Sequence, residues 1–262
     1  MNLCLSNLAW DNARDNELYK KMNMLGINGL EIAPTKLFGE NPYTNQAVAE
    51  EFALYIKNFY NISIVSIQSI WYKRNESIFK SHEERSMLLE YTKKAIDFSV
   101  TIGCKNLVFG CPKNRIIENE SQLSIAQDFF GKIGDYAFGE GVIVSVEPNP
   151  QIYGTNFLNT TREALDFCHL VNNEGLRVNL DFGTIIYNNE SISFTDQDIE
   201  MIGHVHISEP YLKPIEARVE HKTLKETLIK HGYCGYISVE MGVSERQEDI
   251  VEAAVYLKEV FG

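Results

Sequence analysis

The sequence predicts an α/β fold of the (β/α)8-barrel, or TIM-barrel, type. Short apolar runs alternate eight times with amphipathic stretches along the 262 residues. Most of these runs are four to eight residues long and rich in Val, Ile and Leu, as expected of parallel strands buried on both faces. No GxGxxG turn follows the first run, so a closed barrel is better supported than an open nucleotide-binding sheet.

The eight apolar runs predict the strands, which in chain order are Leu3–Leu8, Gly29–Ile32, Ile62–Ile70, Asn106–Phe109, Val142–Glu147, Arg177–Asp181, His204–Ile207 and Tyr236–Glu240. Helical spacing of apolar residues predicts the helices, which are Asn16–Leu25, Asn45–Tyr60, His82–Ile102, Gln122–Gly139, Thr161–Asn173, Asp196–Met201, Lys222–His231 and Gln247–Phe261. This length suits one barrel, so we expect a single domain over residues 1–262.

Capping residues mark several helix ends. Asp15 is expected to cap the first helix, and Ser81 and Gly103 should bound the helix of residues 82–102. The segment Ile185–Phe194 lacks helical periodicity and is predicted to be a loop.

Composition excludes several classes of function. A net charge of -12 argues against a nucleic-acid partner, because such partners require a basic face. No run approaches the ~18 apolar residues of a membrane span. The five cysteines form no CxxC pair, so we expect a reduced protein in the cytoplasm. A small-molecule substrate is therefore the expected partner. Assembly into a homo-oligomer is left open.

Four ligand-type residues end the last four predicted strands: Glu147, Asp181, His206 and Glu240. Barrel active sites lie at the carboxyl ends of the strands, so these side chains should converge. Buried carboxylates repel one another unless a cation lies between them. Three oxygen donors and one nitrogen favour Mn²⁺, Mg²⁺ or Co²⁺, with Zn²⁺ as an alternative.

The two histidines of strand seven, His204 and His206, point the same way because side chains alternate with period two. His206 lies nearer the carboxyl end and is the better ligand, so His204 should be a packed, hydrogen-bonded residue. Any one of the four carboxyl-end residues could instead be the first solvated loop residue. Their occurrence on four successive strands favours the metal site.

Five sequence blocks together resemble the xylose-isomerase-like barrel superfamily of sugar isomerases and epimerases. They are residues 26–32, 144–148, 179–181, 203–208 and 232–240, in matching order along the whole chain. The resemblance implies that the metal set falls on the four residues named above. It also implies that Glu147 and Glu240 are catalytic and exchange protons with the substrate.

The sequence departs from the epimerase pattern at two places. Thr184 stands where the family usually has a histidine, and Leu212 stands where it usually has an arginine. Both missing groups would hold substrate hydroxyls. We expect Thr184, Lys213 and His221 to replace them, and Lys213 mildly favours an anionic substrate.

Further substrate contacts are expected from residues that follow the strands. Asn149 and Asn156 lie in the long loop after strand five, and Trp71 follows strand three. Trp71 would stack on a sugar, although an aromatic that packs the loop fits equally well. Glu31 ends strand two and could bind a hydroxyl or form a salt bridge to a neighbouring strand.

The expected activity is a metal-dependent isomerase or epimerase of a sugar or sugar phosphate. The two glutamates would act as acid and base on a proton α to a carbonyl. Three alternatives stay open: a metal-dependent dehydratase, a non-catalytic metal-binding barrel, and a nuclease like endonuclease IV. The acidic charge opposes the nuclease.

Overall fold

Eight parallel strands close into a barrel in chain order in the computed structural model, which describes residues 1–262. The strands are β1 Asn2–Ser6, β2 Gly29–Ile32, β3 Ser63–Ile67, β4 Asn106–Phe109, β5 Ile143–Val146, β6 Leu176–Asp181, β7 Ile202–Ile207 and β8 Tyr236–Val239. The first strand pairs with both the second and the eighth, which closes the ring. The predicted fold class is confirmed.

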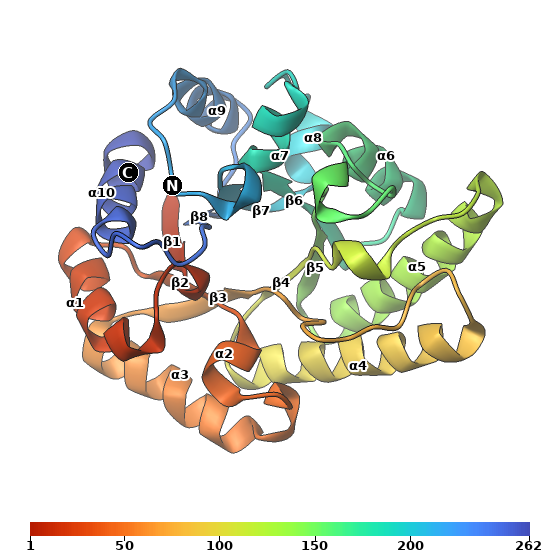
Figure 1. The fold of residues 1–262 in the computed structure, drawn as a ribbon, viewed down its shortest axis with the longest axis horizontal. Helices are drawn as coiled ribbons and strands as arrows, with labels where there is room; N and C mark the ends of the chain where they lie inside the picture. Colours follow the sequence, from red (N-terminus) through yellow and green to blue (C-terminus); the bar gives the residue numbers. More distant parts are fainter.

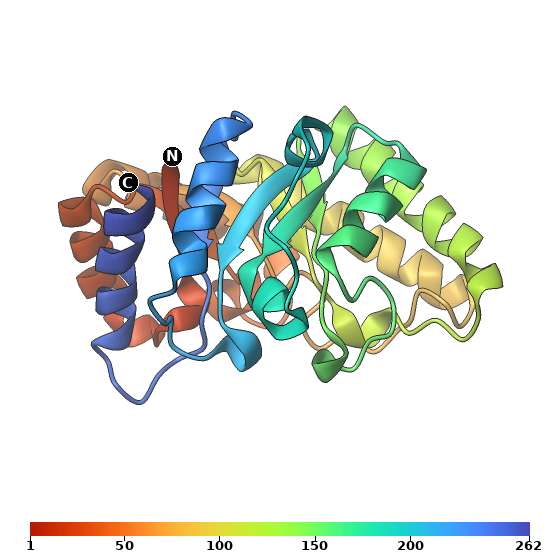
Figure 2. The ribbon, with the colours of Figure 1, turned by 90° about the horizontal axis from the view of Figure 1, so that it is seen from above.

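Helices surround the barrel (Figures 1 and 2). They are α1 Asp15–Leu25, α2 Pro34–Phe38, α3 Gln46–Tyr60, α4 His82–Thr101, α5 Leu123–Gly139, α6 Thr161–Val171, α7 Phe182–Asn188, α8 Asp196–Glu200, α9 Val219–Lys230 and α10 Asp249–Phe261. None of them has the length and apolar character needed to cross a membrane.

One apolar core joins the strands to the helices, and it includes residues from every part of the barrel. Two glycines show how closely the outer layer packs. A Cβ atom on Gly175, just before β6, would lie 2.0 Å from the carbonyl oxygen of Gly134 in α5. The contact between α5 and this loop therefore requires a residue without a side chain.

The main error of the sequence prediction is α7, which occupies residues 182–188 where a loop was expected to begin at Ile185. Asp181 caps this helix, because its side chain accepts a hydrogen bond from the backbone N–H of Thr184. The cap at Asp15 is also wrong, since this residue lies inside α1 and Asp11 caps the preceding turn. Ser81 caps α4 as predicted, and Gly103 is left-handed just beyond its end.

Candidate active site

The carboxyl ends of β5 to β8 bring four side chains together. Glu147 directly follows β5, Asp181 ends β6, His206 lies near the end of β7 and Glu240 directly follows β8. One ligand atom from each lies within 4.8 Å of the others, and the side chains are largely buried. The group lies at the mouth of the barrel, where the strand ends of a parallel barrel meet.

His206 lies between the two glutamates. Its Nδ1 is 3.0 Å from Glu147 Oε1 and 3.2 Å from Glu240 Oε2. Burial alone would lower the pKa of His206, but the carboxylates of Glu31 and Glu240 outweigh this effect and raise the pKa well above its ordinary value. Without a metal ion, the imidazolium is the cation that balances these carboxylates.

The two glutamates differ in their acidity. Burial raises the pKa of Glu240 to about 7, and the charges of Glu147 and Asp181 act in the same direction. Burial also acts to raise the pKa of Glu147. There, however, hydrogen bonds from His206 and Asn149 outweigh burial and lower the pKa of the carboxyl. An environment that separates the pKa values of two carboxyls in this way is typical of an acid and base pair.

Glu31 holds the other side of the His206 ring. Its Oε2 lies 3.0 Å from His206 Nε2, and its carboxylate also accepts bonds from Ser66 at 2.7 Å and Ser238 at 3.2 Å. The pKa of Glu31 falls to about 2 despite complete burial, because His206 and His204 lie beside it. Of the two roles considered for Glu31, the structure shows a salt bridge, but it crosses the barrel from β2 to His206 of β7 and does not join neighbouring strands.

His204 is buried as predicted, but the hydrogen bond expected of it is missing. Its Nε2 lies 3.5 Å from Glu31 Oε1 and has no hydrogen-bond partner. Burial lowers the pKa of His204 to about 4, so this ring is neutral at the base of the site.

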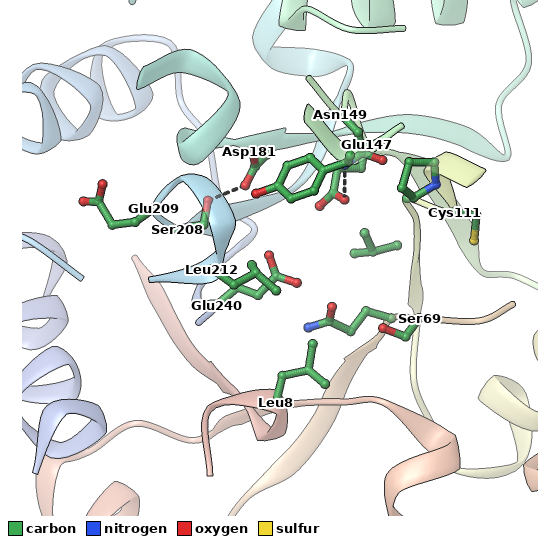
Figure 3. Close-up of a pocket in the computed structure, with 15 residues that line it drawn as sticks. Leu8, Ser69, Cys111, Glu147, Asn149, Asp181, Ser208, Glu209, Leu212 and Glu240 are labelled. Atoms are coloured by element: carbon green, nitrogen blue, oxygen red, sulfur yellow. Dashed lines mark hydrogen bonds between the residues drawn. The ribbon is translucent and has the colours of Figure 1, made fainter. Parts of the chain in front are cut away.

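A cavity of about 190 Å³ opens above this group (Figure 3). Figure 3 shows Glu147, Asp181 and Glu240 pointing into it from different sides. Its lining includes the three carboxylates together with Leu8, Gln68, Ser69, Val108, Gly110, Cys111, Pro112, Asn149, Tyr153, Ser208, Glu209 and Leu212. The volume lies below the range of about 300–1,000 Å³ common for drug-sized ligands, so the cavity suits a small molecule.

The sequence matches the family model described as "Xylose isomerase-like TIM barrel" over residues 20–260. The chain belongs to the xylose isomerase-like TIM-barrel family. No curated protein matches this member at a significant level.

Solved structures similar to this xylose isomerase-like barrel include several sugar epimerases. D-psicose 3-epimerase from Clostridium cellulolyticum H10, solved with D-tagatose, is 16% identical with a TM-score of 0.80, over 100% of this chain and 99% of that one. The 3-keto-D-glucoside 4-epimerase of E. coli is 16% identical with a TM-score of 0.77, over 99% of each chain. An L-ribulose 3-epimerase is 15% identical with a TM-score of 0.73, over 97% of this chain and 86% of that one. These likenesses establish a shared fold.

Thr184 does not face the cavity, which corrects our expectation that it binds substrate. Its side chain is fully buried, and its hydroxyl donates to Asp181 Oδ2 at 2.7 Å and lies 3.0 Å from the carbonyl oxygen of Pro148. Ser208 donates to the other oxygen of Asp181. Both hydroxyls therefore orient the carboxylate of Asp181.

Trp71 and His221 are also structural, so their predicted substrate contacts are wrong. Trp71 is 3% exposed, donates to Thr92 Oγ1 at 2.9 Å and packs against Phe109. His221 is fully buried on α9, where Nδ1 lies 2.9 Å from the hydroxyl of Tyr256. The alternative of a loop-packing aromatic is the correct one for Trp71.

Asn156 and Lys213 lie outside the cavity as well. The side chain of Asn156 bonds both the backbone N–H and the carbonyl of Ile117, so it braces one loop against another. Lys213 is exposed, and its Nζ lies 6.0 Å from the ring centre of Tyr211. The substrate contacts expected of these two side chains are not supported by their positions.

Asn149 lines the cavity and is the predicted substrate residue that the structure places beside the carboxylates. Its Nδ2 donates to Glu147 Oε2 at 2.9 Å, and its Oδ1 accepts a bond from Arg115 at 2.6 Å. Arg115 also donates to the carbonyl of Glu147 at 2.6 Å and is fully buried. The sequence analysis missed Arg115, because no local pattern distinguishes a single loop arginine that folds inward.

Proposed function

We propose that this protein is a divalent-metal-dependent isomerase or epimerase of a small carbohydrate. The observation that carries the proposal is the group of three carboxylates and one imidazole at the ends of β5 to β8. Its donors fit a single hard or borderline divalent ion such as Mn²⁺, Mg²⁺ or Co²⁺. Solved structures of the same fold that are named as sugar epimerases support the proposal.

The residues that would hold the ion are Glu147, Asp181, His206 and Glu240. Glu31 beside His206 Nε2 favours the proton on that nitrogen and leaves Nδ1 for the ion. When bound, the ion supplies a Lewis acid for the oxygens of an α-hydroxy ketone. Every other part of the chemistry falls to side chains of this chain.

Glu147 and Glu240 are proposed to move the proton. Glu147, whose carboxyl has the lowered pKa, accepts the proton from the carbon next to the carbonyl. Glu240, whose pKa is near 7, carries a proton that it can return from its own side of the cavity. Transfer from opposite faces inverts the carbon and gives an epimer, whereas one carboxylate acting alone gives an isomer.

Exchange of the α-hydrogen with deuterated water tests this proposal. The protein is loaded separately with Mn²⁺, Co²⁺, Mg²⁺ and Zn²⁺, incubated with a panel of ketoses, and followed by NMR. We expect exchange with at least one ketose and metal, and its loss in Glu147→Gln and Glu240→Gln, because an amide cannot accept the proton. Metal content is measured in each variant, since both glutamates are also proposed ligands.

Glu245→Gln is the matched control, because Glu245 undergoes the same chemical change at an exposed position outside the cavity. It should exchange hydrogen at the rate of the unmodified protein. Absence of exchange with every ketose and every metal would refute the proposed function.

A further inference from the structure

The cavity is lined by carboxylates but by no lysine, arginine or histidine side chain. Three basic side chains that contact wall residues or the chain beside them are engaged with the protein itself. Arg115 lies behind Asn149 and Glu147, and the amine of Lys36 donates to the carbonyl oxygens of Asn7 and Trp10. Arg218 forms a two-pronged bond with Glu209 at 2.7 and 2.6 Å, which neutralises that glutamate.

This charge distribution opposes an anionic substrate. The carboxylates of Glu147, Asp181 and Glu240 offset the charge of a divalent ion, and no cationic side chain lines the cavity to balance a further negative group. A phosphate or carboxylate placed there would lack a cationic partner in a region of low dielectric constant. Since Lys213 is exposed outside the cavity, it does not supply that partner, which argues against the anionic substrate that the sequence mildly favours.

The polar side chains of the wall are largely engaged with the protein itself. Ser208 donates to Asp181, and Asn149 uses both ends of its amide. The Nε2 of Gln68 donates to Ser6 at 2.7 Å and to Glu31 at 3.2 Å. The wall groups that remain for substrate hydroxyls are the Ser69 hydroxyl, Gln68 Oε1 and the proton of the Tyr153 hydroxyl.

Apolar side chains fill the rest of the wall. Leu8 follows β1, Val108 lies on β4 and Leu212 lies in the loop after β7. Figure 3 shows Leu8 on the side of the cavity away from Glu147 and Leu212 beside Glu240. A hydroxyl placed against these side chains would lose water without gaining a partner.

Leu212 is held in an unusual backbone conformation. Its φ of 52° and that of Tyr211, 65°, are both left-handed, a conformation that is unfavourable for such side chains. Hydrogen bonds maintain it: the N–H of Leu212 donates to Glu209 at 2.9 Å, and its carbonyl accepts from Gly242 at 2.8 Å. The Tyr211 N–H donates to the Tyr153 hydroxyl at 2.8 Å. Leu212 therefore lines the cavity from a strained, left-handed segment that these hydrogen bonds hold in place.

We infer that the substrate is an uncharged, monosaccharide-sized hydroxy ketone with an apolar group, such as the methyl of a terminal deoxy sugar, against Leu8, Val108 and Leu212. This inference rests on the proposed function and names the substrate class of the same site. Leu212 is the residue that sets this preference.

Three matched compounds test the inference. They are the ketohexose that exchanges best in the panel above, its 6-deoxy form and its 6-phosphate. We expect kcat/KM for α-hydrogen exchange to be roughly tenfold higher for the deoxy sugar than for the parent. The phosphate should fall at least about 100-fold below the parent, because it adds charge to an acidic cavity. Equal rates for deoxy and parent sugars would overturn the apolar part, and efficient turnover of the phosphate would overturn the uncharged part.

Variants locate the preference in Leu212. Leu212→Asn places a polar side chain that tolerates a left-handed backbone, and it should abolish the preference for the deoxy sugar. Leu212→Met keeps an apolar wall and should retain the preference. Lys213→Ala should leave the discrimination against phosphate unchanged, and a loss of that discrimination would contradict the inference.

Direct binding separates the inference from the proposed function. If no ketose exchanges hydrogen, the proposed function fails, and calorimetry with the same three compounds and the Mn²⁺-loaded protein still tests the substrate class. Tighter binding of the deoxy sugar than of the parent, and none of the phosphate, would uphold the inference. Equal binding of the three would refute it.

Discussion

A single buried guanidinium determines which way the amide beside Glu147 faces. Arg115 donates to Asn149 Oδ1, so Asn149 Nδ2 must point toward Glu147 Oε2. A carboxylate that accepts such a bond stays ionised and keeps one orientation. Arg115 is therefore a positioning residue for the proposed base, although it does not line the cavity.

Arg115→Met should lower kcat roughly 10- to 100-fold with little change in KM, as is usual when support of a metal site or base is removed. Without the guanidinium, the amide of Asn149 can rotate and present its oxygen to Glu147. Steady-state kinetics and Mn²⁺ calorimetry measure the two effects, and Arg115→Lys should restore part of kcat. A kcat equal to that of the unmodified protein would show that Arg115 has only a packing role.

Glu31→Gln should weaken Mn²⁺ binding roughly 10- to 100-fold. The amide no longer offers two anionic oxygens to His206 Nε2, so the ring loses the partner that favours its Nδ1 as the free nitrogen. Calorimetry of metal binding is the measurement, with circular dichroism to verify the fold. Unchanged affinity would mean that Glu31 serves only the packing of the barrel interior.

The candidate site was partly predictable from single residues. Glu147, Asp181 and Glu240 could be found because an apolar run shows where a strand ends. Trp71, His221 and Asn156 were misassigned because the sequence shows that a residue follows a strand but not where its side chain points. Each of them bonds a partner more than twenty residues away, and such pairings are not visible in local patterns.

At the scale of elements, the packing of α5 on the loop before β6 depends on Gly175. Gly175→Ala should lower the free energy of unfolding by about 1–3 kcal/mol, because its Cβ would overlap the backbone of Gly134. Gly131→Ala in the same helix is the control, since a Cβ there meets nothing within 4 Å and alanine favours a helix. Urea unfolding measures both, and equal stability of the two variants would disprove this account.

Strands were easier to predict than the short helices at the barrel mouth. The predicted strand ends differ from the observed ones by at most three residues, because burial on both faces forces an uninterrupted apolar run. Helix α7 was missed because Asp181 acts as both a candidate ligand and a helix cap. The sequence analysis recognised Asp181 only as a candidate ligand and therefore missed the helix that this residue caps.

The stability of the whole molecule should depend on pH through the candidate site. Glu240 has a pKa of about 7 in the folded protein, raised by burial from 4.5. The folded state therefore keeps a proton that the unfolded state releases, and this contribution is full below pH 4.5 and lost as pH rises through 7. The carboxylate neighbours of His206 raise its pKa above 6.5. The stability that its bound proton contributes is therefore also lost as the pH rises above 6.5.

We expect the melting temperature of the metal-free protein to fall between pH 6.5 and pH 8, because below pH 6.5 the lowered pKa values of His204 and His221, both about 4, oppose the effect of Glu240. Saturating Mn²⁺ should raise it more at pH 8 than at pH 5, because the ion competes with protons for these groups. Glu240→Gln should show a smaller fall, since it removes one of the two titrating groups. A metal-free melting temperature that rises over this interval, with no difference in the variant, would contradict the prediction.

The position of His206 between Glu147 and Glu240 has a consequence for how the site is filled. The same nitrogen that faces both glutamates must give up its proton before it can bind an ion. Loading the site is therefore an acid-releasing reaction as well as an association. In a weakly buffered solution, each equivalent of ion taken up should liberate protons in a measurable ratio, and the heat of uptake should vary with the ionisation enthalpy of the buffer.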